Sequence, residues 1–255
     1  MKKQQIISSL LLLAATAHIS CRKQTIPVPA PVPVNAISKI DKDGDLQQVS
    51  YNADGTIHTV VLKQSGGAMV TNYQYHYENG KLREIDFGGK WKYHYSGNLV
   101  SFVETFNNAG EIRYRFEFSY TNQLLTEKKE YLVKNVSANP YSKTIYTYTA
   151  GGNVSKTERF DYINNDWHRA ETYEIVQYDQ HPNTSLHLEN YPFLPLSCFS
   201  KNNPVKELFI NDIGQQTGTI THQYGYDNNG RPGARKTTYT NLGFPDSVSI
   251  TQFEY

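Results

Sequence analysis

Cysteine, methionine and tryptophan are scarce in this chain of 255 residues, with two copies of each. The two cysteines, Cys21 and Cys198, allow at most one disulfide, in an oxidising compartment and only where Cys21 is unmodified. An excess of charge of one sign is also lacking, because the formal net charge is +1, so nothing indicates nucleic-acid binding. Hydrophobic residues make up only 38%, which fits sheets with one solvated face better than a core buried on both sides.

Catalytic motifs and helical patterns are missing as well. The chain has no glycine-rich phosphate loop, no paired-histidine zinc helix and no serine elbow. Stretches with helical periodicity are nearly absent. The sequence therefore indicates no catalytic residue and no cofactor.

Tyrosine and phenylalanine are abundant, with 20 and 11 copies, and many of them follow a two-residue period. In the stretch 111–120, apolar or aromatic residues alternate with charged or small polar ones, so a strand there has one apolar and one polar face. The polar face of this and later strands is expected to carry charge in mid-strand, at Arg113, Arg115, Lys129 and Arg159.

Copies of this unit, separated by glycine- and asparagine-rich turns, fill most of the chain. The last three expected strands, for example, cover 215–226, 231–241 and 245–255. Consecutive hairpins without crossover helices form an antiparallel meander, and many twisted strands tend to curl or close. We therefore predict an all-β protein: a large antiparallel β-meander of about 14–16 strands, curved into a half-barrel or barrel-like sheet.

The first 20 residues have the pattern of a secretory signal peptide. Lys2 and Lys3 form its positive end, and residues 6–17 are an apolar stretch too short to span a bilayer comfortably. Residues 15–17 (Ala-Thr-Ala) offer a cleavage site that would release a soluble protein. Residues 18–21 (His-Ile-Ser-Cys) instead resemble a bacterial lipobox, which implies acyl chains such as palmitate on Cys21 and cleavage before it.

A proline-rich segment follows Cys21 and favours the lipoprotein interpretation. Alternating prolines at 27–33 hold a semi-rigid extended spacer, which suits a lipid-tethered protein, although a soluble protein could carry the same tail. The expected organisation is a signal peptide at 1–20, a lipidated cysteine with its tether at 21–40, and one β-meander domain at 41–255. We expect the protein to be a monomer.

The six residues 226–231 (Tyr-Asp-Asn-Asn-Gly-Arg) match the core of the YD (Rhs-type) repeat, and 51–55 and 77–80 are weaker copies. With the leader, the cysteine and the proline tether, these hairpins resemble a family of Bacteroidota lipoproteins of unknown function. The resemblance covers roughly residues 41–255. It implies a porin-like antiparallel sheet and a place in the cell envelope, and supplies no catalytic residue.

A long loop at 179–204 interrupts the strand rhythm and is rich in proline and apolar residues. Such a loop is usually functional or folded onto the body. It is therefore either a plug that covers an open end of the sheet or a docking loop for a ligand or partner, with Tyr191, Phe193, Leu194 and Phe199 as its candidate contacts. Trp91 and Trp167 are candidate aromatic platforms for a sugar, or else packed strand residues.

Two patterns of polar residues suggest metal sites, and neither supports one. Residues 41–45 alternate acidic side chains, but the positions where an EF-hand needs glycine and glutamate hold Leu46 and Asn52. His58, His76 and His94 recur at equal spacing, yet equivalent strands of consecutive hairpins lie roughly 9.6 Å apart, too far to share a metal comfortably.

The sequence thus predicts a lipid-anchored protein of the outer membrane that faces the periplasm or the cell surface. Its β surface would bind or scaffold a protein or glycan of the envelope, without catalysis. One alternative is a glycan- or peptide-processing enzyme of the envelope. Another is a membrane-embedded barrel, whose charged face would have to line the lumen while its tyrosines faced lipid.

Overall fold

The computed structural model describes residues 37–67, 69–134, 137–183, 192–195 and 200–255. The predicted signal peptide, Cys21 and most of the predicted tether lie outside these residues. So do three loop residues that the sequence singled out, Tyr191, Cys198 and Phe199.

The described residues form sixteen strands and one short 3-10 turn, Ser65–Gly67. The strands are β1 (Lys39–Lys42), β2 (Asp45–Tyr51), β3 (Ile57–Lys63), β4 (Val70–Glu78), β5 (Lys81–Asp86), β6 (Lys90–Ser96), β7 (Leu99–Phe106), β8 (Ile112–Thr121), β9 (Leu124–Lys134), β10 (Ser137–Tyr148), β11 (Val154–Ile163), β12 (Asp166–Pro182), β13 (Asn202–Asn211), β14 (Gln216–Tyr226), β15 (Pro232–Asn241) and β16 (Ser247–Glu254). Among these residues, no helix is long and apolar enough to cross a membrane.

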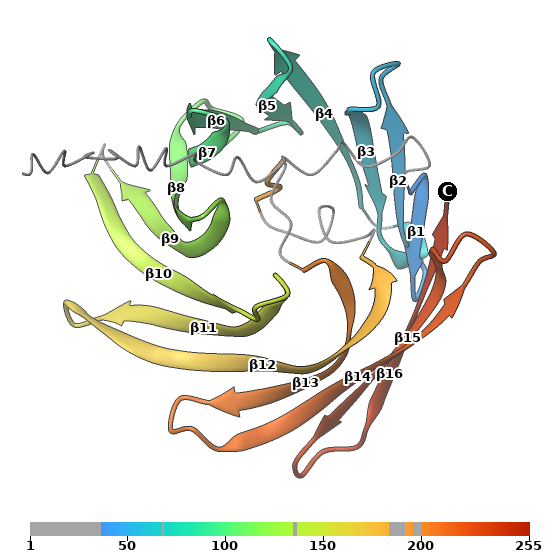
Figure 1. Cartoon of the computed structure of the whole chain (residues 1–255). Coiled ribbons are helices and arrows are strands. Elements are labelled where there is room, and N and C mark those ends of the chain that lie inside the picture. The colour runs from blue at the N-terminus through green and yellow to red at the C-terminus, as the bar shows by residue number, and fades with distance from the viewer. Residues whose placement is uncertain (1–36, 68, 135–136, 184–191, 196–199) are drawn as a thin grey trace, which may run out of the picture. The chain divides into compact units, whose positions relative to one another are not determined.

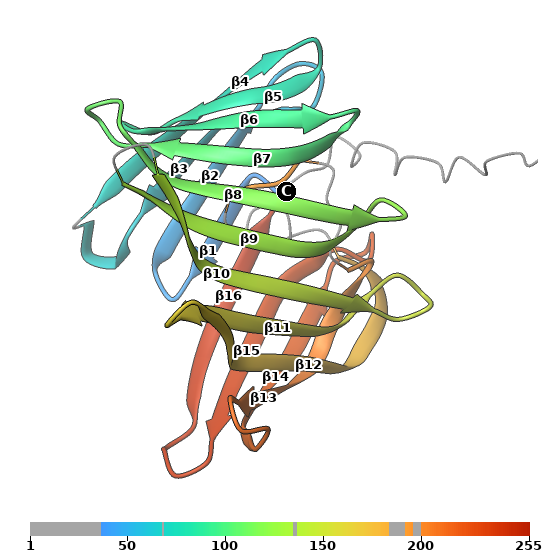
Figure 2. The same ribbon diagram turned by 90° about the vertical axis from the view of Figure 1, so that its left-hand side faces the viewer.

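Each strand pairs antiparallel with its neighbours in the chain, and β1 pairs with β16 to close the barrel (Figure 1). Figure 2 shows one wall of this barrel, in which the strands follow one another in chain order. The prediction of an all-β antiparallel meander that curves into a barrel-like sheet is therefore confirmed. Closure removes the two unpaired edges that an open sheet would leave.

The closing strand shows that the barrel domain begins earlier than predicted. β1 starts at Lys39, and Ile37 and Ile40 are only 2% and 5% exposed. Ile40 lies opposite Phe253 of β16, and the Lys39 ammonium is 2.7 Å from a carboxylate oxygen of Glu254. β1 therefore begins within the last residues that the sequence analysis assigned to the tether, and these residues pair with β16.

Turn residues fix the register of the hairpins. Between β4 and β5, Asn79 and Gly80 have φ values of 51° and 71°. Positive φ at both central residues is what a two-residue hairpin turn of the right twist requires, and asparagine and glycine reach it at the least cost.

Buried and exposed side chains alternate along the strands, and in a closed barrel the buried set points into the lumen. On β16, Thr251 and Phe253 are buried, whereas Val248 and Ile250 are 54% and 43% exposed. On β8, Phe116 is 1% exposed and faces the lumen. Phe116 and Phe118 of the alternating stretch 111–120 therefore line the inside, whereas Tyr114 near the end of the strand is 36% exposed.

The prediction that all mid-strand charges share the polar face is wrong for one residue. Arg113, Arg115 and Lys129 face outward, opposite Phe116 and its lumenal neighbours. Arg159 instead faces the lumen. Residues directly opposite each other on paired strands share a face, and the pairs Arg159–Thr144, Thr144–Lys128 and Lys128–Phe118 connect Arg159 to a buried lumenal residue. β-Bulges change which face a residue occupies, and the β9–β10 and β11–β12 pairs contain them.

The largest hydrophobic cluster lies in the lumen, with buried members on β2–β9 and on β11, and part of the predicted loop enters it. Phe193 and Leu194 are 8% and 3% exposed and belong to this cluster. The Phe193 ring lies edge-on to Tyr75, with ring centroids 5.4 Å apart. The Tyr93 hydroxyl donates a hydrogen bond of 2.9 Å to the Phe193 carbonyl, so this part of the loop is packed inside the barrel.

Candidate functional site

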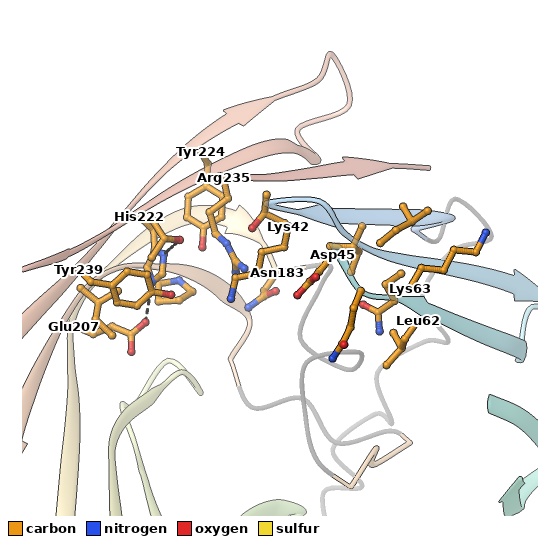
Figure 3. A pocket seen from close by; sticks show the side chains of 18 residues that line it. Lys42, Asp45, Leu62, Lys63, Asn183, Glu207, His222, Tyr224, Arg235 and Tyr239 are labelled. Atoms are coloured by element: carbon orange, nitrogen blue, oxygen red, sulfur yellow. Dashed lines mark hydrogen bonds and ion pairs between the residues drawn. The ribbon is translucent and has the colours of Figure 1, made fainter. Parts of the chain in front are cut away.

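The remaining part of the lumen contains a cavity of about 640 Å³. One of its walls is formed by β1–β3 and the other by β13–β16, with Asn183 and Pro204 from the two ends of the long loop (Figure 3). A volume of this order lies within the range of roughly 300–1,000 Å³ that is usual for small-molecule sites. The charged, aromatic and hydroxyl residues of the walls decide what it can bind.

Three neighbouring strands place a carboxylate, an imidazole and a hydroxyl in line. His222 Nε2 lies 2.9 Å from Glu207 Oε1, and His222 Nδ1 lies 3.0 Å from Thr237 Oγ1. Because a carboxylate can only accept, the Nε2 proton is donated to Glu207; in the neutral ring with this tautomer, Nδ1 accepts from the Thr237 hydroxyl. The His222 side chain is 8% exposed and that of Glu207 18%, so the chain of hydrogen bonds is largely shielded from water.

Register explains why these side chains meet. His222 of β14 lies directly opposite Thr237 of β15, and Glu207 of β13 lies opposite Ile220, two residues before His222. All four face the lumen, and diagonal neighbours on one face of a sheet are within reach of long side chains.

Next to this chain, Thr251 of β16 lies opposite Arg235 of β15, and both line the cavity. Thr251 is only 1% exposed, and its hydroxyl has no hydrogen-bond partner among the described residues. An unpaired buried hydroxyl costs free energy that a ligand in the cavity would recover. Tyr224 and Tyr239 add their rings to the same wall.

The opposite wall carries a base and an acid near the end of the β1–β2 hairpin. Lys42 lies opposite Asp45 in the register. Asp45 Oδ1 accepts a 2.7 Å hydrogen bond from the Ser65 backbone N–H, which fixes the carboxylate. Ile40 and Leu62 make the rest of this wall apolar.

A polar network holds the base of the long loop beside the cavity. The Tyr226 hydroxyl donates a short hydrogen bond to Asp179, and Asn203 Nδ2 donates to the same carboxylate oxygen at 3.2 Å. The His181 ring stacks on Tyr226 with centroids 3.8 Å apart. Burial, followed by the interaction with Asp179, raises the pKa of Tyr226, so the phenol stays protonated and remains a donor.

Further charges face the lumen between the cavity and the hydrophobic cluster. The Arg159 guanidinium lies 2.8 Å from Glu171, on neighbouring strands. Lys128 also faces the lumen, and burial lowers the pKa of its ammonium group. The lumen is therefore apolar between the first strands and polar between the later ones.

The two candidate platforms do not meet and do not line the cavity. Trp91 is 7% exposed and packs against Phe87 and Tyr73 at 5.4 and 5.9 Å, so its ring is part of the hydrophobic cluster. Trp167 is half-buried, with Tyr162 at 4.9 Å and the Lys143 ammonium at 4.7 Å. Of the two interpretations of Trp91, the structure thus shows the packed strand residue.

Phe193 and Leu194 are not available as an external docking surface either, because their side chains are buried in the lumen. The evenly spaced histidines His58, His76 and His94 lie on three different strands, β3, β4 and β6. His94, for example, stacks on Phe102 at 4.0 Å and lies 3.2 Å from Glu104. In the parts of the chain that the structure describes, no group of three His, Cys, Asp or Glu residues could hold a metal ion.

Sequence analysis did not identify Glu207, His222, Thr237 or Thr251. Each occupies an ordinary position in an alternating strand, and no motif joins them. The only local signal was the placement of His222, Thr237 and Thr251 in the expected strands 215–226, 231–241 and 245–255. Their convergence depends on the pairing of β13 to β16.

No protein-family model matches the sequence, and no curated protein matches it. Among solved structures, a porin-like protein from Bacteroides uniformis aligns with a TM-score of 0.63 and 16% identity, over 88% of this chain and 98% of that one. A porin-like protein from Bacteroides vulgatus aligns over 86% and 98% with a TM-score of 0.49 and 12% identity. At this identity the first likeness concerns the fold: the chain folds as a porin-like antiparallel β-barrel of sixteen strands.

Proposed function

We propose that this protein is a lipid-anchored envelope protein whose barrel stands in water and binds a small polar molecule in its lumen, without catalysis. The distribution of charge over the two faces of the barrel wall is the observation that carries the proposal. The outer face is charged in mid-strand, whereas the lumen holds both the hydrophobic cluster and the polar cavity.

Ion pairs occur around the outer face. Lys129 lies 3.1 Å from Glu127 on β9, and Lys90 of β6 lies 3.0 Å from Glu84 of β5. Further pairs of this face are Arg115–Glu117 and Lys156–Glu158. A lysine or arginine on the lipid face of an inserted barrel costs about 2–4 kcal/mol at the bilayer midplane. A barrel with this outer face is therefore more stable in water than in lipid, which favours anchoring over insertion.

Acyl chains on Cys21 would supply the membrane attachment that the barrel wall does not. Stable anchoring needs more than one acyl chain, which bacterial lipidation provides, and the proline-rich segment would hold the barrel away from the bilayer. The proposed location is the outer membrane, facing the periplasm or the cell surface. In this proposal the lumen binds a small molecule. That molecule is either free or part of a protein or glycan of the envelope.

Two variants test the proposal. Cys21→Ser should move the protein from the membrane to the soluble fraction, and it should remain folded without detergent. Native mass spectrometry of this purified variant should then detect a co-purifying small molecule. Ile220→Trp, which places an indole in the cavity, should prevent the co-purification. Retention of Cys21→Ser in the membrane, or a need for detergent, would contradict the proposal.

An enzyme of the envelope is the second candidate, because the Glu207–His222–Thr237 chain has the acid–imidazole–hydroxyl order of an activated nucleophile. One feature favours binding instead. Thr237 lies on a strand that is paired on both sides, so the nearby backbone N–H groups serve the sheet rather than an oxyanion.

A further inference from the structure

The ligand class of the lumen cavity follows from its wall chemistry. We infer that the cavity binds a neutral, hydroxyl-rich molecule of the size of a mono- or disaccharide, held by Glu207, Thr237, Tyr239 and Thr251. The inference rests on the proposed function, since it assumes that the lumen binds a small molecule.

Hydrogen-bonding capacity is the first reason. After the bonds within the wall are made, Glu207 keeps a second carboxylate oxygen and Thr237 keeps lone pairs, all of which can only accept. The Thr251 and Tyr239 hydroxyls can donate and accept. A ligand hydroxyl, which also does both, matches such a mixed set. A carboxylate or phosphate could pair with Arg235 of the lining, but it has no proton to donate to the acceptors on Glu207 and Thr237.

Charge balance is the second reason. The wall of β13–β16 carries one acid and one base, Glu207 and Arg235, and the facing wall carries another such pair, Asp45 and Lys42. Lys63 is a third base of the lining, but Figure 3 shows its side chain directed away from the other labelled residues. Lys42 and Asp45 are exposed, whereas Glu207 is largely shielded, so a ligand with a net charge would place a charge without an opposite partner beside the shielded wall, which is unfavourable. A neutral ligand avoids that cost.

Ring surfaces are the third reason. Tyr224 and Tyr239 line the cavity and add ring surface beside the polar chain, whereas Tyr226 does not line it and stacks on Tyr224 and His181. Aromatic faces carry partial negative charge and attract the partly positive C–H groups of an apolar ring face. A sugar ring presents such a face next to a rim of hydroxyls.

Binding to the soluble Cys21→Ser protein tests the ligand class. The neutral probes are glucose, galactose, N-acetylglucosamine, maltose and lactose, and the charged probes are glutamate, lysine and glucose 6-phosphate. Saturation-transfer NMR and calorimetry should detect binding of at least one neutral sugar. The affinity should fall about tenfold in Thr251→Val and in Glu207→Gln, which corresponds to one lost hydrogen bond of about 1.4 kcal/mol.

Thr238→Val is the matched control, because Thr238 neighbours Thr237 on the outer face and its hydroxyl cannot reach the lumen. Thr251→Val has a second readout. Since it removes an unpaired buried hydroxyl, it should keep or raise the thermal midpoint while it weakens sugar binding, which separates loss of a ligand contact from loss of fold.

The outcomes distinguish the two proposals. If only charged probes bind, or if the co-purifying molecule is charged or wholly apolar, the inferred ligand class is wrong while lumenal binding stands. If sugars bind equally to the wild-type lumen and to Thr251→Val and Glu207→Gln, they bind elsewhere and the inference is again wrong. If no probe binds and no molecule co-purifies, both the inference and the lumenal binding function fail.

Discussion

Replacing Phe193 by alanine should unfold the barrel at markedly lower denaturant concentration, because this residue fills the lumen from a distant part of the chain. Its ring is 8% exposed and meets Tyr75 edge-on at 5.4 Å. Its carbonyl accepts the Tyr93 hydrogen bond of 2.9 Å, which holds the backbone in place when the ring is removed. The surrounding cluster therefore has little freedom to collapse into the space.

A buried phenylalanine-to-alanine change costs about 3–5 kcal/mol, which includes the cavity left behind. A domain of this size loses roughly 2–4 °C in thermal midpoint per kcal/mol, so a decrease of about 6–20 °C is expected. Phe244 offers a matched control, since it is 73% exposed on the β15–β16 turn. The same chemical change there should alter the free energy of unfolding by less than about 0.5 kcal/mol.

Urea unfolding of the Cys21→Ser protein, followed by tryptophan fluorescence and far-ultraviolet circular dichroism, measures both variants. Trp91 belongs to the same hydrophobic cluster as Phe193 and so reports on its packing. If Phe193→Ala and Phe244→Ala lower the midpoint by the same small amount, the loop does not occupy the lumen. The assignment of the buried face to the inside of the barrel would then lose its main tertiary support.

Two further perturbations test the barrel wall. Burial raises the pKa of three lumenal tyrosines, Tyr51, Tyr95 and Tyr178, from 10.0 to about 12. These phenols ionise at lower pH in the unfolded chain than in the folded barrel, so the free energy of unfolding should be unchanged below pH 10 and should fall as the pH rises from 10 to 12. A titration followed by phenolate absorbance and circular dichroism checks this. Unchanged stability across that window would contradict it. Gly89→Ala would place a Cβ 2.3 Å from the Phe106 carbonyl oxygen and should cost about 1–3 kcal/mol, whereas Gly225→Ala, whose nearest contact is 4.0 Å away, should be nearly neutral.

Local sequence was sufficient to predict the strands and the turns between them. The expected strands 215–226 and 231–241 correspond to β14, Gln216–Tyr226, and β15, Pro232–Asn241. A two-residue period and a positive-φ turn are properties of neighbouring residues, so they can be read without the rest of the chain. On the apolar face predicted for 111–120, Phe116 and Phe118 are buried for the same reason, whereas Tyr114 is 36% exposed.

Errors arose where pairing between strands changes the facing of a side chain. Arg159 was expected on the polar face, but bulges in the neighbouring pairs bring it to the lumen. Trp91 could have been an exposed platform or a packed residue, and its contacts with Tyr73 and Phe87 make it a packed one. A bulge shifts the alternation of inward- and outward-facing side chains by one residue, and no residue pattern in these strands predicted where the bulges lie.

The amino-acid sequence by itself determined that the chain forms amphipathic hairpins, since alternation and turn chemistry act over a few residues. It also supplied the lipobox-like segment that underlies the proposed anchor at Cys21. Only the tertiary structure decided that β1 closes on β16, that the loop enters the lumen, and that Glu207, His222, Thr237 and Thr251 share one wall. These outcomes depend on which distant strands pair and in which register, and that selection is made by the burial of the whole lumen rather than by any single segment.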